Sequence, residues 1–192
     1  MPLLPAPIDR DELARRYIAT EAKVEVESYR RYRDVLDEAG RRLLASFGVD
    51  APSPLPASLH AWRTFAEVPA ALAELRRRGR RIAILSNVDR DLIASSIPQL
   101  GLEPDMVVTA EDSGSYKPAP GHWRVFRERS GAAVEGTIHV GASQYHDMRP
   151  AAALGYRTVF VDRHGEKLET KPTRVIPDLA SLADVIEELA RG

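Results

Sequence analysis

The sequence predicts an α/β fold, with a parallel sheet core and a separate helical domain before it. From about residue 65 onward, short apolar runs alternate with stretches of helical periodicity, as in parallel sheets whose strands are connected by helices. Residues 9–47 show only helical periodicity, and a linker containing Pro52, Pro54 and Pro56 follows them. We therefore expect a helical domain over residues 1–64 and an α/β core domain over residues 65–192.

Two helices arranged as a hairpin account for the N-terminal periodicity. Apolar residues recur at three-to-five spacing over residues 13–26, and a second apolar stripe covers residues 35–47. Asp9 stands three residues before Glu12, which is the spacing of a capping box and predicts the start of the first helix. Gly48 predicts the end of the second helix. The acidic segment that begins at Asp9 therefore has a structural explanation.

The core is predicted to alternate helices and strands. In chain order, the elements are helix 68–78, strand 81–86, helix 91–100, strand 106–109, helix 123–128, strand 137–140, helix 149–154, strand 158–161 and helix 179–189. Ligands of such parallel sheets bind outside the carboxyl ends of the strands. The residues directly after each strand are therefore the candidates for a functional site.

Composition and charge exclude several classes of protein. The 27 Lys and Arg nearly balance the 28 Asp and Glu, so nothing in the net charge of -1 favours nucleic acid or an anionic membrane as a partner. The lack of cysteine excludes a disulfide scaffold, a thiolate nucleophile and a Cys-ligated zinc site, and fits a reducing compartment. No apolar run is long enough to span a bilayer, and residues 1–8 do not resemble a signal peptide. We expect a cytoplasmic protein.

Polar side chains follow three of the predicted strands. Ser86 and Asn87 follow the first strand, Lys117 follows the second, and Ser143 and Asp147 follow the third. A hydroxyl, an ammonium and a carboxylate at one edge can hold an anionic substrate and manage its charge in a transition state. The alternative is structural: α/β sheets commonly end in polar loops, and Ser86 or Asp147 could simply cap the next helix.

Three segments resemble the second, third and fourth motifs of the haloacid dehalogenase (HAD) superfamily. They are Ile84–Asp89, Ser115–Pro118, and His139–Asp147, the last followed by Ala151–Gly155. Their order, spacing and strand-end context agree with the superfamily over about residues 66–165. Residues 9–64, with Tyr29–Arg33 among them, resemble the helical cap of type II 2-haloacid dehalogenase relatives.

The resemblance implies a role for each candidate. Ser86 would hydrogen-bond an oxygen of the substrate's phosphoryl or carboxylate group, and Asn87 would line the same pocket. Lys117 would neutralise the nucleophile and the developing charge, and Asp147 would be the acid of the fourth motif. Ser143 of that motif is a further candidate for substrate binding.

Other residues near these motifs have structural explanations. Asp89 is placed to cap the helix that follows Ser86. His139 lies inside a predicted strand and is expected to pack there, because the five histidines show no metal-ligand spacing. The segment from Gly141 to Tyr145 resembles a nucleophile elbow, but a tyrosine replaces the second glycine that this turn needs.

The chain departs from the superfamily at Ala142. Metal-dependent phosphatases of the superfamily have an Asp directly after the glycine of the fourth motif, and this Asp binds Mg²⁺. A methyl group cannot ligate a hard cation, which needs oxygen donors. The departure predicts that no metal is bound and favours dehalogenation over phosphate hydrolysis.

A second departure concerns the first motif. The superfamily's nucleophile is an Asp that directly follows an N-terminal apolar strand, but the residues before Asp9 include three prolines, which cannot pair as a central strand. In the resembled fold, this strand lies between the strands that end at Ser86 and Val140. We expect either that the natural sequence begins further upstream or that the chain is a degenerate relative. The chain alone would then be marginally stable, aggregate, or close the gap by direct pairing or by borrowing a strand from a second copy.

These features predict an HAD-like hydrolase that acts on a small anionic substrate, either a 2-haloacid or a phosphate ester. The reaction would be displacement by an Asp carboxylate followed by hydrolysis of the covalent ester. The alternative is a non-catalytic HAD-like binding or regulatory protein. Neither nucleic acid nor a membrane is an expected partner, and a homodimer stays open.

Overall fold

Two short parallel sheets lie at the centre of the protein. The computed structural model describes residues 8–191. In the first sheet β1 (Ala83–Ser86) pairs with β2 (Met106–Thr109), and in the second β4 (Arg157–Val161) lies between β3 (Ile138–Gly141) and β5 (Arg174–Ile176). The sequence prediction located the first four strands and missed β5. The parallel α/β core is thus confirmed.

The two sheets are not joined to each other. Within residues 8–191 no strand pairing links β1 to β3, so the predicted closure of the gap by direct pairing is wrong. Val108 of β2 and Val159 of β4 are completely buried, whereas every residue of β3 is only half-buried. The sheet is therefore divided at the place where the resemblance located an additional strand.

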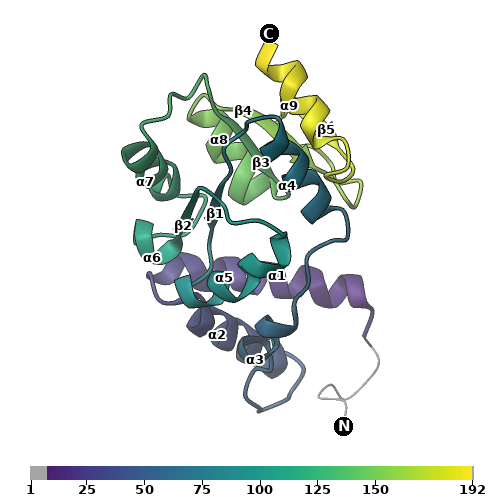
Figure 1. Cartoon of the computed structure of the whole chain (residues 1–192). Helices are drawn as coiled ribbons and strands as arrows, with labels where there is room; N and C mark the ends of the chain where they lie inside the picture. Colours follow the sequence, from purple (N-terminus) through teal and green to yellow (C-terminus); the bar gives the residue numbers. More distant parts are fainter. Residues whose placement is uncertain (1–7, 192) are drawn as a thin grey trace.

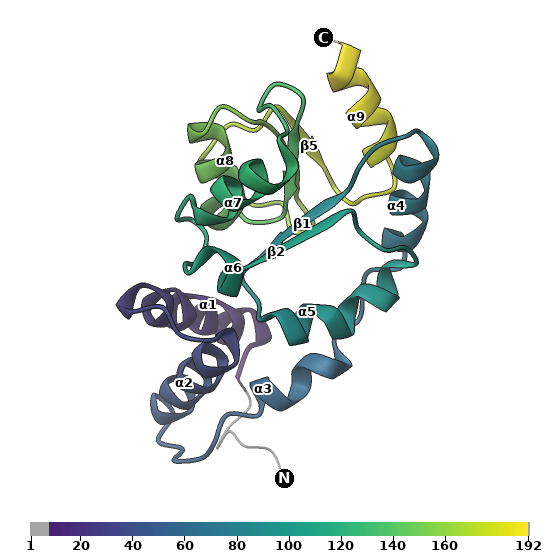
Figure 2. The ribbon, with the colours of Figure 1, turned by 60° about the vertical axis from the view of Figure 1, so that its left-hand side comes forward.

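Helices cover both faces of the strands. The helices of the core are α4 (Val68–Arg77), α5 (Arg90–Ser96), η2 (Ile97–Leu100), α6 (Ala110–Ser113), α7 (Gly121–Ser130), η3 (Gln144–Met148, a π-helix), α8 (Arg149–Ala153) and α9 (Leu182–Arg191). Figure 2 shows α7 and α8 on one side of the strands and α4 and α9 on the other. No helix in the described range has both the length and the apolar character needed to cross a membrane.

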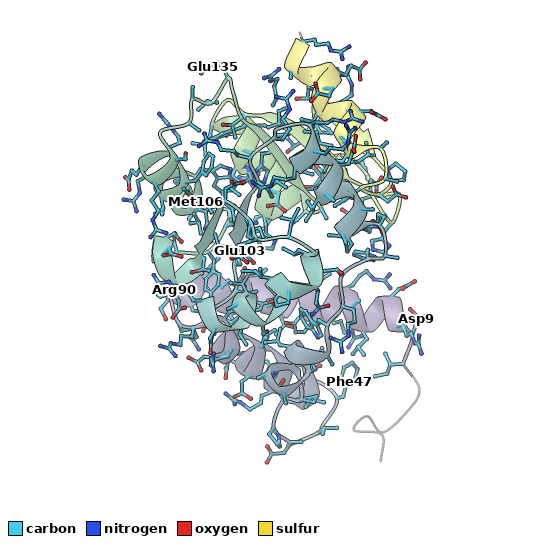
Figure 3. All side chains as sticks on the ribbon, in the orientation of Figure 1. Asp9, Phe47, Arg90, Glu103, Met106 and Glu135 are labelled. Carbon is cyan, nitrogen blue, oxygen red and sulfur yellow. The ribbon has the colours of Figure 1, made fainter. Side chains whose placement is uncertain are left out.

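The N-terminal residues form the predicted helical hairpin, α1 (Arg10–Glu27) and α2 (Tyr32–Ala45), followed by the short α3 (Leu55–Ser58) and η1 (Leu59–Ala61). The carboxylate of Asp9 accepts hydrogen bonds from the backbone N–H groups of Asp11 and Glu12, at 3.1 and 3.0 Å. Asp9 and Phe47 lie toward the same end of the hairpin (Figure 3). Asp9 is therefore a helix cap, as the sequence predicts.

The hairpin packs against the carboxyl ends of β1 and β2 (Figures 1 and 2). Val24 and Val35 of the hairpin share a buried cluster with Ala110 and Tyr116, which follow β2. The hydroxyl of Tyr116 also donates a 2.7 Å hydrogen bond to the backbone oxygen of Arg30. Residues after the strand ends are thereby enclosed between the hairpin and the sheet. The division of the chain at residues 64 and 65 stays a prediction.

Asp89 has a different partner from the expected one. It directly precedes α5, but its side chain makes no capping hydrogen bond to that helix. The carboxylate instead accepts hydrogen bonds from the backbone N–H groups of Tyr32 and Arg33, at 2.7 and 3.2 Å, where α2 begins. A core residue therefore caps a helix of the hairpin.

Candidate active site

Lys117 and Asp147 form a buried ion pair between the two sheets. Nζ of Lys117 lies 2.7 Å from Oδ1 of Asp147, and each side chain is 11% exposed. The same ammonium donates a 3.0 Å hydrogen bond to the backbone oxygen of Leu85 in β1. An ammonium has three N–H donors. Residues within the described range use two of them, so one N–H is left for a ligand. The structure thus brings together two of the predicted site residues.

The turn after β3 places Asp147 close to the backbone. Asp147 lies in the π-helix η3, an element often found at functional sites. A Cβ atom at Gly141 would come within 2.5 Å of the Cβ of Asp147, so only glycine fits there. Burial alone would raise the pKa of Asp147, but the hydrogen bond from His139 and the charge of Lys117 outweigh it and lower this pKa. Asp147 is therefore a carboxylate at neutral pH.

Ser86 ends β1 beside this pair. Its backbone oxygen accepts a 3.0 Å hydrogen bond from Nε2 of the buried His122. Its hydroxyl makes no hydrogen bond to any residue from 8 to 191. The hydroxyl is consequently available to an anionic group, although its predicted contact with substrate stays a prediction.

Asn87 supports the loop that carries Lys117. Its Oδ1 accepts a hydrogen bond from the backbone N–H of Lys117 at 2.8 Å, and its Nδ2 donates to the backbone oxygen of Lys117 at 3.2 Å. Both groups of the amide are therefore used to hold the lysine backbone. The pocket-lining role implied by the resemblance stays a prediction.

Ser143 begins the helical turn that contains Asp147. Its Oγ accepts a 3.0 Å hydrogen bond from the backbone N–H of His146 and lies 3.2 Å from Nδ1 of the same residue. Nε2 of His146 in turn lies 3.3 Å from Oε2 of Glu25 in α1. Ser143 thus helps connect the strand end to the hairpin, and its predicted contact with substrate is untested.

Sequence reasoning missed the carboxylates on the hairpin side. Glu25 is only 6% exposed and extends toward His146. Glu21 accepts hydrogen bonds from the hydroxyls of Tyr17 and Tyr32, at 2.8 and 3.0 Å, and its burial raises its pKa. The sequence did contain a signal for these carboxylates: Tyr17, Glu21 and Glu25 recur every four residues and therefore share one face of the helix. That face is polar where an apolar core face was expected.

The donors at this site do not fit a magnesium ion. Ala142 is exposed directly after Gly141 and has no ligand atom. Oδ1 of Asp147 is already engaged by Lys117 and His139. Across residues 8–191, no group of three or more His, Asp or Glu side chains could hold a metal ion.

Comparison with known proteins identifies related sequences. The family profile described as "Hydrolase: haloacid dehalogenase-like hydrolase" matches residues 8–155. Haloacetate dehalogenase H-2 of a Moraxella species is 29% identical over 129 residues, covering 65% of this chain and 57% of that protein. Phosphoserine phosphatase of Thermus thermophilus is 34% identical over 119 residues, covering 60% and 48%. The aligned region therefore spans about half the length of these curated relatives.

Solved structures of dehalogenases share the fold. The L-2-haloacid dehalogenase of Xanthobacter autotrophicus with chloropropionic acid covalently bound superposes with a TM-score of 0.80 at 16% identity, covering 92% of this chain and 86% of that one. The L-2-haloacid dehalogenase RSc1362 gives a TM-score of 0.81 at 20% identity, covering 92% and 86%. These two likenesses show the fold, and the family match over residues 8–155 shows that the chain belongs to the haloacid dehalogenase-like hydrolases.

Proposed function

We propose that the protein hydrolyses a small anionic substrate between the hairpin and the carboxyl ends of β1 and β3. The observation that carries this proposal is the buried contact between Lys117 and Asp147 beside the unbonded hydroxyl of Ser86. The Lys117 ammonium can donate a charge-assisted hydrogen bond to an anion through its unused N–H, although Asp147 already balances part of its charge. The hydroxyl supplies a second donor at the same strand end.

The reaction requires a nucleophile in addition to these groups. An Asp carboxylate would attack the carbon or phosphorus centre, expel halide or an alcohol, and form an ester that water then hydrolyses. In the part of the chain described, Asp147 is the one carboxylate in contact with the Lys117 ammonium, and it is held by that contact. We propose that the nucleophile is carried by a strand that fits between β1 and β3.

Two observations bear on the class of substrate. Ala142 disfavours metal-assisted phosphate transfer, and a haloacetate dehalogenase is among the relatives. A phosphoserine phosphatase is also among them, so a phosphate ester is the second candidate. Of the two, we propose the halogenated acid.

The wider proposal includes a cap domain over residues 1–64, a core domain over residues 65–192 and a cytoplasmic location.

Turnover by two forms of the protein tests this function. The 192-residue chain is compared with a version preceded by a designed apolar strand ending in Asp, using halide release from 2-chloropropionate and phosphate release from a phosphate ester. We expect the extended form to release halide, and the Lys117→Met variant of that form to lose this activity.

The controls separate the alternatives. Turnover by the 192-residue chain would mean that another carboxylate, with Asp147 the first to replace, is the nucleophile. Saturable binding of 2-chloropropionate or phosphate by both forms, without turnover by either, would instead support the non-catalytic binding protein. The absence of both binding and turnover would contradict the proposed site.

A further inference from the structure

His139 connects Asp147 to a buried tryptophan. Nε2 of His139 lies 3.3 Å from Oδ1 of Asp147, and Nδ1 receives a 3.3 Å hydrogen bond from Nε1 of Trp123 in α7. Trp123 is 1% exposed, and the centroids of the two rings are 5.2 Å apart. The ring that was expected only to pack therefore has a polar partner on each nitrogen.

The donors and acceptors of this chain fix the protonation of the imidazole. An indole N–H can only donate, so Nδ1 of His139 must offer its lone pair to Trp123. The proton of the neutral ring then lies on Nε2, where it can be donated to the carboxylate of Asp147. A protonated imidazole would instead direct an N–H toward the indole N–H. The hydrogen bonds thus run in one direction, from Trp123 through His139 to Asp147.

The two oxygens of Asp147 are consequently not equivalent. Oδ1 is engaged by both Lys117 and His139. Oδ2 makes no hydrogen bond to any of residues 8–191 and is thus the oxygen left for a substrate or a water molecule. Two donors on one oxygen fix the rotation of the carboxyl group, so His139 determines where Oδ2 points.

We propose that His139 is a positioning residue, which Trp123 holds as the Nε2–H tautomer so that it orients the Asp147 carboxylate. The consequence for catalysis rests on the proposed function. Within residues 8–191, the hydrogen bonds link the ring to the charge of Asp147 and, through Asp147, to that of Lys117. Removal of the imidazole should leave Asp147 with one donor in place of two.

Nuclear magnetic resonance tests the first part without any need for turnover. Long-range ¹⁵N–¹H spectra of the 192-residue chain should show the neutral His139 ring as the Nε2–H tautomer, because Nδ1 accepts the indole N–H of Trp123. In Trp123→Phe, His139 should lose this fixed tautomer. An Nδ1–H tautomer of His139 in the natural sequence would overturn the proposal.

Two replacements of His139 test the second part. Gln can present one N–H to Asp147, whereas Leu has the volume but no donor. The ¹³C signal of the Asp147 carboxyl should reveal a pKa raised toward its ordinary value in His139→Leu and nearer the natural value in His139→Gln. In a form of the protein that turns over substrate, His139→Leu should lower kcat by roughly five- to tenfold with KM almost unchanged, and His139→Gln should retain most of the kcat. Equal carboxyl titrations in both variants would refute the positioning role, whether or not the protein turns over substrate.

Discussion

The carboxylate of Asp89 lies 3.1 Å from Nε of Arg33 and also accepts the backbone N–H of that residue at 3.2 Å. Arg33 is in the first turn of α2, whereas Asp89 follows β1 and is 1% exposed. This contact fastens the hairpin to the core immediately beside Ser86 and Asn87. The buried carboxylate of Asp89 therefore helps hold the hairpin in position over the site.

Replacement of Asp89 should weaken this attachment. We expect Asp89→Ala to lower the free energy of unfolding by about 1–3 kcal/mol, because the N–H groups at the start of α2 lose their acceptor. Urea denaturation measures the change. Asp91→Ala is the matched control, since Asp91 also pairs with Arg33 but its side chain is 67% exposed. Equal effects of the two replacements would contradict the capping role of Asp89.

Lys117 should dominate the binding of anions. Lys117→Met removes the charge-assisted contact, and we expect affinity for small carboxylates or phosphate to fall by roughly ten- to a hundredfold. Titration calorimetry compares this variant with Lys171→Met, which removes an exposed lysine from a late loop. If both variants bind like the natural protein, Lys117 does not face the ligand.

Magnesium should have no specific site on this protein. Calorimetry with millimolar Mg²⁺ is expected to show only weak, non-saturating heats, because Ala142 has no ligand atom and Asp147 has only Oδ2 left for a cation, its Oδ1 being engaged by Lys117 and His139. Saturable binding that disappears in Asp147→Ala would overturn this prediction.

His122 should make the protein sensitive to mild acid. Burial lowers the pKa of this histidine to about 4. A base whose pKa falls on folding binds fewer protons in the folded state than in the unfolded state. Its contribution to the free energy of unfolding is therefore complete above the unfolded pKa of about 6.5 and is lost as pH falls toward 4. The loss should approach about 3 kcal/mol. Thermal denaturation at several pH values should show a flatter profile for His122→Asn than for the natural protein, and identical profiles would contradict this cause.

The sides of β1 and β3 that pair with no strand among residues 8–191 should limit the stability of the chain. Backbone groups on these sides have no ladder partners within the described residues, although the carbonyl groups of Leu85 and Ser86 in β1 accept hydrogen bonds from Lys117 and His122. A fully buried group of this kind costs about 1–3 kcal/mol, and a half-buried group, as in β3 and most of β1, should cost less. We expect the version with an added strand to melt at a higher temperature and the 192-residue chain to aggregate or dimerise, as measured by calorimetry and light scattering. A monomeric 192-residue chain that melts cooperatively at the same temperature would refute this expectation.

Local patterns in the sequence determined most of the secondary structure. The hairpin, its cap at Asp9 and four of the strands follow from apolar periodicity and from residues that start or stop helices. Strand β5 was missed because it has only three residues, Arg174–Ile176, and two of these are exposed. The residues after the strands indicated Lys117 and Asp147, because parallel strands present their carboxyl ends at one edge.

The tertiary structure alone decided which partners these residues have. Asp89 caps a helix that begins 57 residues earlier in the chain, and Asn87 binds the backbone of a lysine 30 residues later. His139 looks like a strand residue in the sequence, and its polar role depends on Trp123, which lies on a different element. Periodicity reports which side of an element is buried, since burial repeats with the geometry of the backbone. A hydrogen bond between distant elements leaves no such repeat, so these contacts appear only once packing has brought the elements together.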